Sequence, residues 1–282
     1  MISVQDLRFS YTRAPFLTDI SFQVETGSSL GFLGPSGAGK STLQKILIGM
    51  LRHYGGQAQV AGLEARDADS AFYERIGVAF EYPTLYEKLT GRQNLAFFGS
   101  LYQNKQLDIS ALLDSVGLLP SADQKVAAYS KGMRTRLNFV KALLHAPDIL
   151  FLDEPTSGLD PTNAHVIKQM ILAEKQKGRT ILITTHNMQD ATELCDQVAF
   201  IVDGKLRALD TPHHLIMRKA ATEVAYTYLE DGREAQGTCA LAATGDDALL
   251  RRLMAENKLL TIHSREQTLG DVFMDITGRV LA

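Results

Sequence analysis

The stretch LGFLGPSGAGKSTLQKILIGM, residues 30–50, decides the fold. Its first four residues are apolar and predict a short buried strand, and the apolar residues after position 40 recur at helical spacing. Glycines interrupt the pattern between these two elements. From Gly34 to Ser41 the residues match G-x-x-x-x-G-K-[ST], the spacing of a loop that binds phosphate. A strand before the loop and a helix after it argue against a chance glycine-rich turn.

This loop predicts a site for a nucleoside triphosphate. Glycines let successive backbone N–H groups face phosphate oxygens, and the helix adds further N–H groups and the positive end of its dipole. Lys40 can reach the β- and γ-phosphates, and the Ser41 hydroxyl can bind Mg²⁺. The residues expected at the nucleotide are Gly34, Pro35, Ser36, Gly37, Ala38, Gly39, Lys40, Ser41 and Thr42.

Composition places the chain among ordinary globular proteins. It has 282 residues, 45% of them hydrophobic and 22% charged, which is enough for one large domain or two smaller ones. The net charge of -3 gives no reason to expect a nucleic acid partner, which favours a basic face. Cys195 and Cys239 lie far apart and are expected to be free thiols in a reducing cytosol. We expect no targeting segment and no membrane span, so any role at a membrane needs a separate chain.

The apolar patterns predict an α/β chain followed by a small α+β extension, which begins after Thr211-Pro212. Antiparallel strands are predicted at 2–11 and 16–24, a short strand at 57–61, a buried strand at 76–80, further strands at 149–152 and 180–184, and a hairpin at 196–202 and 205–209. Helices are predicted at 67–75, after Thr90, at 109–116, after Ser130 and at 161–178. The extension is predicted to contain a strand at 223–229 and helices at 246–254 and 268–277.

Polar residues follow two of the buried strands. Asp153 and Glu154 follow the strand at 149–152, where one carboxylate can hold Mg²⁺ and a second can polarise an attacking water. His186 follows the next strand and can contact the γ-phosphate or orient Glu154. A solvated pair of acids and a structural histidine are the alternatives. Tyr11 can stack on adenine or fill a gap in the core.

Four motifs occur in the order typical of one protein family. They are GPSGAGKST at 34–42, YSKGM at 129–133, ILFLDEPTSGLDP at 149–161 and TTH ending at His186. This order resembles that of an ABC transporter ATP-binding subunit, over about residues 2 to 215. The likeness is specific because YSKGM lies just upstream of LDEP, as the family requires.

The resemblance implies an architecture and an assembly. The architecture is a RecA-like P-loop NTPase core with an antiparallel β subdomain and a helical subdomain inserted at about 83–148. These parts make up an ABC ATPase domain at 1–211, and the small extension occupies 212–282. The assembly is a head-to-tail homodimer with two ATP molecules between its subunits. The roles implied for polar residues are adenine stacking for Tyr11, Mg²⁺ association for Asp153, general base for Glu154 and switch histidine for His186.

The YSKGM segment adds a second anion site. Ser130 and the N–H groups that open its helix can bind an anion. No phosphate is expected near them within one subunit, so the γ-phosphate held by the partner completes the site. By the resemblance Gly132 and Met133 belong to this site, and Asp160 ends the loop at 157–160 that crosses the dimer.

The chain differs from the usual family pattern at Glu81 and in the LSGGQ motif, where Tyr129, Lys131 and Met133 replace Leu, the first Gly and Gln. Lys131, in place of the first glycine, can add a positive charge near the nucleotide or point to solvent, and we favour solvent. Glu81 stands where the family usually has Gln. A carboxylate can bind Mg²⁺, but when ionised it cannot donate a hydrogen bond, and it adds negative charge near the γ-phosphate.

One ATPase domain without a membrane span implies a separate transmembrane permease and a place on the cytoplasmic face of the cell membrane. The segment at 83–102 lies where the family binds its permease, although most of its aromatic residues are expected to lie in the core of the helical subdomain. TLGDVFMDITGR at 268–279 resembles the ending of ABC-2 type exporter subunits, apart from Gly270. This ending favours export of an unidentified substrate.

Two alternatives remain. A non-transport ABC protein that acts on ribosomes or DNA usually carries a second ATPase domain or a long coiled coil, and the sequence contains neither. A regulatory subunit that binds nucleotide without hydrolysis is disfavoured by intact Lys40, Asp153, Glu154 and His186, whereas Glu81 favours it weakly.

Overall fold

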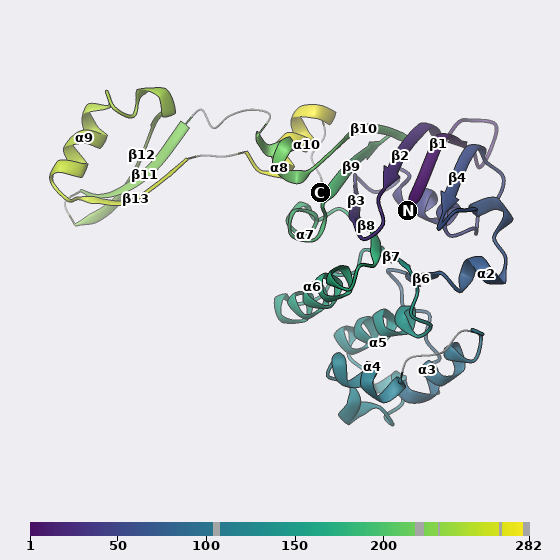
Figure 1. Ribbon diagram of the computed structural model, residues 1–282. Helices are drawn as coiled ribbons and strands as arrows, with labels where there is room; N and C mark the ends of the chain where they lie inside the picture. The colour runs from purple at the N-terminus through teal and green to yellow at the C-terminus, as the bar shows by residue number, and fades with distance from the viewer. Residues whose placement is uncertain (104–107, 218–222, 231, 265–266, 279–282) are drawn as a thin grey trace. The chain divides into compact units, whose positions relative to one another are not determined.

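The computed structural model describes residues 1–103, 108–217, 223–230, 232–264 and 267–278 (Figure 1). Met1–Asp210 form one compact unit, and the described part of Thr211–Val280 forms a second. The boundary between them falls at the Thr211-Pro212 pair. Among the described helices, none is long and apolar enough to cross a lipid bilayer.

A six-stranded sheet forms the centre of the first unit. Its strands are β3 (Ser29–Leu33), β6 (Ile76–Ala79), β7 (Ile149–Asp153), β8 (Thr180–Thr185), β9 (Gln197–Val202) and β10 (Lys205–Asp210). Their order is β10-β9-β3-β8-β7-β6, and all are parallel except β10, which pairs antiparallel with β9. Every residue of β3 and β8 is buried, which explains their continuous apolar or small-residue sequence. These strands confirm the predicted ones within one or two residues.

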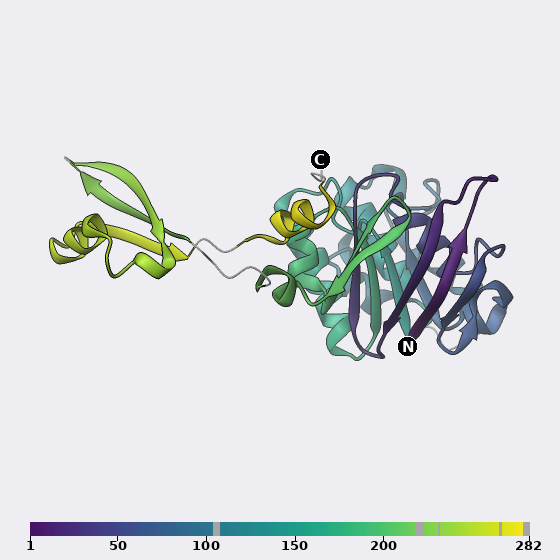
Figure 2. The ribbon, with the colours of Figure 1, turned by 90° about the horizontal axis from the view of Figure 1, so that it is seen from above.

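A second, antiparallel sheet packs on the first. It contains β1 (Ile2–Phe9), β2 (Leu17–Val24), β4 (Gly55–Val60) and β5 (Leu63–Glu64), in the order β2-β1-β4-β5. Figure 2 shows its purple strands beside the green hairpin of the larger sheet, where β2 contacts β10. Phe22 of β2 and Phe32 of β3 meet edge to face at 5.2 Å, so the two sheets share one hydrophobic core.

Four helices of the first unit flank these sheets: α1 (Lys40–Leu47), α2 (Ser70–Tyr73), α6 (Pro161–Gln176) and α7 (Met188–Leu194). The predicted helix at 67–75 is shorter than expected because the Asp69 side chain accepts from Phe72 N and begins α2 there. α7 was not predicted. The sequence feature that marks its start is Asn187, whose side chain caps the first turn by accepting hydrogen bonds from two backbone N–H groups.

The inserted helices are α3 (Gly91–Gly99), α4 (Ile109–Ser115) and α5 (Lys131–Leu143), which Figure 1 shows grouped together. Thr90 begins α3 with a reciprocal cap: its Oγ1 accepts from Gln93 N at 3.1 Å, and Gln93 Oε1 accepts from Thr90 N at 2.9 Å. Ser130 begins α5, and its Oγ accepts from Met133 N at 3.2 Å. Both predicted helix starts are therefore confirmed.

The expectation that most aromatic residues near α3 lie in the core is wrong. The exposed fractions are 78% for Tyr82, 50% for Tyr86 and 42% for Phe97. The buried face of α3 carries Gly91, Asn94, Leu95 and Gly99 instead. Asn94 bonds to the backbone of Tyr86 and of Thr90, so the polar side chain stabilises the loop from inside and the rings remain outside.

The second unit is built on a three-stranded antiparallel sheet in the order β12-β11-β13. Its elements are α8 (Pro212–Met217), β11 (Glu223–Glu230), β12 (Arg233–Ala240), α9 (Ala248–Ala255), β13 (Leu259–Ser264) and α10 (Leu269–Thr277). Tyr226 and Tyr228 on β11 pack with Leu250 and Leu253 of α9 to form a small core. The predicted strand and both predicted helices are present, whereas β12 and β13 were not predicted. Arg279 of the quoted ending lies outside the described residues.

We predict that Thr90→Ala lowers the free energy of unfolding by about 1 kcal/mol, because it removes the acceptor that begins α3. Urea denaturation followed by circular dichroism measures the change. Thr90→Ser retains the hydroxyl and is expected to stay within a few tenths of a kcal/mol of wild type. Equal losses in the two variants would contradict the prediction.

Candidate nucleotide-binding site

Three neighbouring parallel strands end at the candidate site. β3 leads into the phosphate loop, β7 ends at Asp153, and β8 lies between them and pairs with both. Because the carboxyl ends of parallel strands meet at one edge of a sheet, three segments distant in sequence lie close together. These segments are the phosphate loop, Asp153-Glu154 and Thr185-His186.

The phosphate loop lines a cavity of about 210 Å³, together with Phe16, Glu81 and Glu154. Lys40 is buried beside this cavity, and its Nζ donates to Gly34 O at 2.6 Å and to Pro35 O at 3.1 Å. Burial lowers the pKa of Lys40, whereas the charges of Glu154, Asp153 and Glu81 act to raise it. The site thus surrounds a buried ammonium group with carboxylates, and a polyphosphate can replace the carbonyl partners of Nζ.

Two glycines of the loop serve different purposes. A Cβ on Gly34 would lie 2.1 Å from Ile201 O of β9, so this position requires glycine for close packing on the sheet. A Cβ on Gly37 would meet nothing within 4 Å, but its φ is +78°, which other residues rarely adopt. Gly39 begins α1 without a side-chain cap, so the N–H groups of the first turn are available to phosphate oxygens.

Glu154 and His186 are joined directly. His186 Nδ1 lies 2.8 Å from Glu154 Oε1, and Thr185 Oγ1 donates to Glu154 Oε2 at 3.2 Å. The Glu154 side chain is 12% exposed. An ionised carboxylate only accepts hydrogen bonds, so the tautomer of His186 that pairs with an ionised Glu154 is the one with a proton on Nδ1. The Oδ1 atom of Asp153 accepts a hydrogen bond from the Thr184 hydroxyl.

Tyr11 lies at the start of α1, as part of an aromatic group that sequence reasoning only partly identified. Its hydroxyl lies 3.0 Å from Thr42 Oγ1, and its ring is in edge contact with Phe9 and Phe16. The residue is 56% exposed, so it does not fill a gap in the core. Phe16 was missed because it stands at the beginning of a predicted strand, where an aromatic residue is commonly structural. It lines the cavity of the phosphate loop.

Ser130, Gly132, Met133 and Asp160 are not among the residues that line that cavity. Ser130 and Asp160 cap the N-termini of α5 and α6. Asp160 accepts from Asn163 N at 3.0 Å and from Asn163 Nδ2 at 2.6 Å, and these bonds lower the pKa of Asp160. Gly132 lies against the Asn163 side chain. The YSKGM segment therefore contacts the first turn of α6, directly after the loop at 157–160, within one chain.

Lys131 does not simply point to solvent, as the sequence led us to expect. Although the residue is exposed, its Nζ lies beside Gly158, where a Cβ would be 2.0 Å from it. Lys131 also lines a cavity of about 540 Å³ with Glu81 and Ser157. The start of α5 and the loop at 157–160 pack together. The Lys131 ammonium group therefore lies over this loop.

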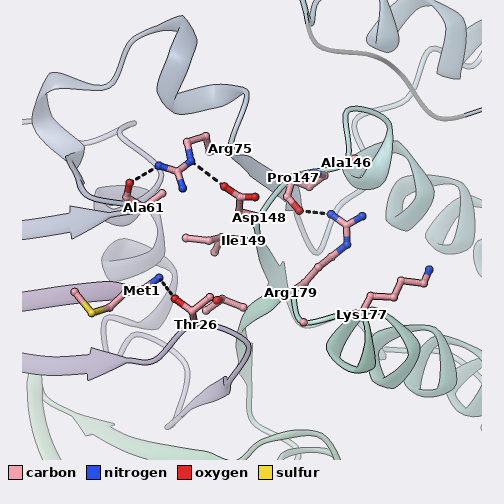
Figure 3. A pocket seen from close by; sticks show the side chains of 12 residues that line it. Met1, Thr26, Ala61, Arg75, Ala146, Pro147, Asp148, Ile149, Lys177 and Arg179 are labelled. Atoms are coloured by element: carbon pink, nitrogen blue, oxygen red, sulfur yellow. Dashed lines mark hydrogen bonds and ion pairs between the residues drawn. The ribbon is translucent and has the colours of Figure 1, made fainter.

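Another cavity, of about 420 Å³, lies at the opposite edge of the sheet (Figure 3). Its guanidinium groups already have partners. Arg75 Nε donates to Asp148 Oδ2 at 2.8 Å, and Arg179 donates to Pro147 O and pairs with Glu174 at 2.5 Å. We therefore place the candidate site at the phosphate loop, where the titratable groups converge on one cavity.

Comparisons with known proteins agree with this geometry. A family model described as ABC transporter matches residues 17–157. The chain is 48% identical over 284 residues to the fluoroquinolones export ATP-binding protein of Mycobacterium tuberculosis, with 100% of this chain and 94% of that protein covered. This chain belongs to the ABC transporter ATP-binding proteins. The Nod factor export ATP-binding protein I of Rhizobium meliloti is 33% identical to this ABC protein, with 99% of this chain and 89% of the relative covered.

A solved structure, that of an ATP-binding subunit of an ABC transporter, has the same fold. It aligns with this ABC protein at a TM-score of 0.70 and 30% identity, and the alignment covers 76% of this chain and 91% of that chain. The RecA-like P-loop fold, the binding of ATP and its hydrolysis are thus confirmed. The protein is the ATP-hydrolysing subunit of an ABC exporter, a class that dimerises and acts with a membrane permease. The roles of its individual site residues stay predictions.

We predict that Gly34→Ala destabilises this ABC protein more than Gly37→Ala does. The Gly34 Cβ would collide with the backbone of β9, which costs about 1–3 kcal/mol or more. The Gly37 Cβ has free space, so only the strained φ remains, at roughly 1–2 kcal/mol. Urea denaturation without nucleotide measures both. A Gly37 variant that is the less stable of the two would refute the close-packing argument.

Proposed function

We propose that Glu154 is the general base of ATP hydrolysis and that His186 orients it. The observation that carries this proposal is the shielded Glu154 carboxylate, which lies beside the phosphate loop and contacts His186 Nδ1 at 2.8 Å. Lys40 and the N-terminal N–H groups of α1 bind the β- and γ-phosphates. Tyr11 supplies an exposed ring for adenine. A carboxylate in this position can accept a proton from the water that attacks the γ-phosphate.

We propose that Mg²⁺ enters together with ATP. Ser41, Glu81 and Asp153 supply oxygen ligands of the type that Mg²⁺ prefers. Among the described residues, no three His, Cys, Asp or Glu side chains are grouped to hold a metal ion by themselves. A cation that enters with ATP needs only a few protein oxygens, because the phosphates of the nucleotide supply other ligands. Lys40 and Mg²⁺ together would offset the negative charge of the carboxylates and the triphosphate.

We propose that the second phosphate site belongs to the partner subunit's nucleotide. Ser130, Gly132 and Met133 open α5 away from the phosphate loop of their own chain, and Asp160 opens α6 next to them. A head-to-tail homodimer would bring these residues to the γ-phosphate held by the other subunit. ATP would then hold the two subunits together, and its hydrolysis would release them.

We propose that the permease binds an aromatic surface made of Tyr82, Tyr86 and Phe97. All three side chains are exposed, and the rings of Tyr86 and Phe97 lie 5.0 Å apart. Phe98, beside them, carries the Lys141 ammonium group 4.8 Å above its ring. Exposed aromatic residues of this kind commonly mark contact surfaces. Binding there would hold the protein on the cytoplasmic face of the cell membrane.

We propose a fluoroquinolone as the first candidate substrate. The relative that is named for fluoroquinolone export is 48% identical over the full length of this chain, including the second unit. The relatives named for Nod factor export are less similar, at 33% identity for the one from Rhizobium meliloti. The residues that select the substrate would lie in the permease, so this proposal depends on the similarity of whole export systems.

We predict that Glu154→Gln slows ATP hydrolysis by at least about 100-fold, because the general base is lost. The same variant should form a dimer in saturating Mg-ATP, because its phosphate contacts are intact. Phosphate release and light scattering after size exclusion measure the two properties. A Glu154→Gln variant that hydrolyses ATP at the wild-type rate, or that stays monomeric with and without the permease, would refute the proposal.

Glu81→Gln is the matched control, because it removes one negative charge from the same cavity. Its turnover is expected to change less than that of Glu154→Gln, since Glu81 would contribute to metal binding and not to proton transfer. Equal losses in the two variants would show that charge alone, and not a base at position 154, determines the rate.

We predict that cells expressing this protein with its permease accumulate less of a fluoroquinolone than cells expressing the permease with Lys40→Ala. Fluorescence of the drug in washed cells measures accumulation. The Lys40 variant keeps the permease present but removes the phosphate contact that hydrolysis requires. Equal accumulation in both strains would exclude fluoroquinolones as substrates and leave the ATPase assignment standing.

A further inference from the structure

The backbone at Glu154 has a conformation that needs support from both sides. Its φ is +47°, in the left-handed region that residues other than glycine seldom adopt. On the strand side, Glu154 N donates to Thr184 O at 2.9 Å. On the other side the chain turns at once, and Ser157 N donates to Glu154 O at 3.1 Å. Whatever fixes this turn therefore also fixes the direction of the Glu154 side chain.

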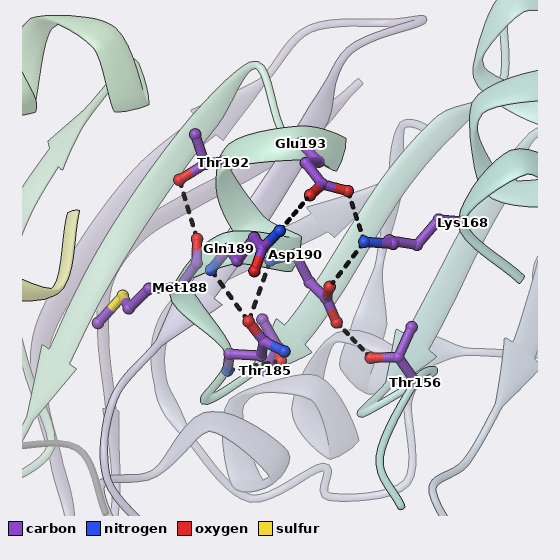
Figure 4. Close-up of polar contacts among 9 residues, drawn as sticks. Thr156, Lys168, Thr185, Met188, Gln189, Asp190, Thr192 and Glu193 are labelled. Carbon is purple, nitrogen blue, oxygen red and sulfur yellow. Dashed lines mark hydrogen bonds and ion pairs between the residues drawn. The ribbon is translucent and has the colours of Figure 1, made fainter. Parts of the chain in front are cut away.

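Thr156, inside that turn, is held by a buried carboxylate. Its Oγ1 donates to Asp190 Oδ2 at 2.5 Å (Figure 4). The two residues are 9% and 6% exposed, so water does not compete freely for this contact. A hydrogen bond to an ionised acceptor is roughly twice as strong as one between neutral groups. Within the described structure, Asp190 is the hydrogen-bond partner of the Thr156 side chain, and this bond holds Thr156 in the turn.

Asp190 lies on α7, and the segment that leads into α7 binds the Glu154 carboxylate. α7 begins at Asn187, whose Oδ1 accepts from Asp190 N at 3.1 Å and whose N donates to Thr185 Oγ1 at 3.0 Å. Thr185 Oγ1 in turn donates to Glu154 Oε2 at 3.2 Å. The start of α7 thus reaches the Glu154 side chain, while Asp190 reaches the backbone turn that follows Glu154.

The charge of Asp190 is compensated from α6. Lys168 Nζ lies 3.3 Å from Asp190 Oδ1 and 2.5 Å from Glu193 Oε2 (Figure 4). The contact with Glu193 raises the pKa of Lys168, and the contact with Lys168 lowers the pKa of Glu193. Lys168 therefore stays charged between two acids of α7. Because α6 begins directly after the loop at 157–160, Lys168 also connects the far end of that loop to α7.

We propose that Asp190 is a positioning residue for ATP hydrolysis: by holding Thr156, it keeps the turn after Glu154, and hence the Glu154 carboxylate, in the orientation that the attacking water requires. This inference rests on the proposed role of Glu154 as general base. Asp190 does not line the cavity of the phosphate loop. Its removal is therefore expected to slow the chemical step and to leave ATP binding intact.

Thr156→Val tests the proposal with little change in side-chain size. We expect the kcat of the full-length chain to fall about 10-fold to 100-fold, because the base is misplaced. The KM for ATP should change less than about twofold, because Lys40 and the phosphate loop are untouched. Asp190→Asn should lower kcat in the same direction, and Thr156→Ser should restore most of it. An unchanged kcat in Thr156→Val would overturn the proposal.

Thr192→Val is the matched control on α7. The Thr192 hydroxyl donates to Met188 O at 2.9 Å within its own helix (Figure 4), and it forms no hydrogen bond with residues 154–157 in the described part of the chain. Its kcat is expected to equal that of wild type. If Thr192→Val slowed hydrolysis as much as Thr156→Val, the effect would belong to the general stability of α7, and the positioning role would be refuted.

Single-turnover hydrolysis separates failure of this proposal from failure of the proposed function. If Glu154→Gln is as fast as wild type, the base assignment fails, and the positioning role fails with it. If Glu154→Gln is slow but Thr156→Val is not, only the positioning role fails. The double variant should be no slower than Glu154→Gln alone, because Thr156 acts through Glu154. Losses that multiply in the double variant would show that Thr156 acts independently of the base.

Discussion

The parallel pairing of β3, β8 and β7 is the constraint on which the rest of the structure depends. It places the end of β8 between the phosphate loop and Asp153-Glu154. His186, which follows β8, therefore stands beside Glu154, where its ring contacts the carboxylate. Were β3 and β7 direct neighbours, the histidine would have no place between them. The strand order thus decides which polar groups lie beside the phosphate loop.

The same strand order also gathers carboxylates around the buried ammonium group of Lys40. Lys40 is buried, and the carboxylates of Asp153, Glu154 and Glu81 lie close enough to influence its protonation. Buried ions need partners, and here the Lys40 ammonium group uses backbone carbonyl oxygens of the loop itself. A triphosphate can take over these contacts. Thr156, which follows these carboxylates in the chain, bonds to Asp190 of α7, and Asp190 pairs with Lys168 of α6. These contacts connect the carboxylate segment to both helices.

Motifs with local geometry could be predicted, and contacts between distant segments could not. The phosphate loop and the caps at Thr90 and Ser130 depend on neighbouring residues, so their spacing was sufficient. The exposure of Tyr86 and Phe97 was predicted wrongly, because a buried polar residue, Asn94, occupies the inner face of α3. Phe16 and Asp190 belong to no motif in the sequence. Only packing brings Phe16 to the cavity and Asp190 to the turn after Glu154.

The sequence by itself determined the P-loop fold class, the order of the main strands of the first unit along the chain and the motifs typical of an ATP-binding protein, because these follow from hydrophobic period and short motif spacing. The tertiary structure alone decided the order of strands across the sheet, the contact of Lys131 with Gly158 and the hydrogen bond from Thr156 to Asp190. Such contacts join segments tens of residues apart. Their geometry depends on how whole elements pack, and no local pattern of residues records it.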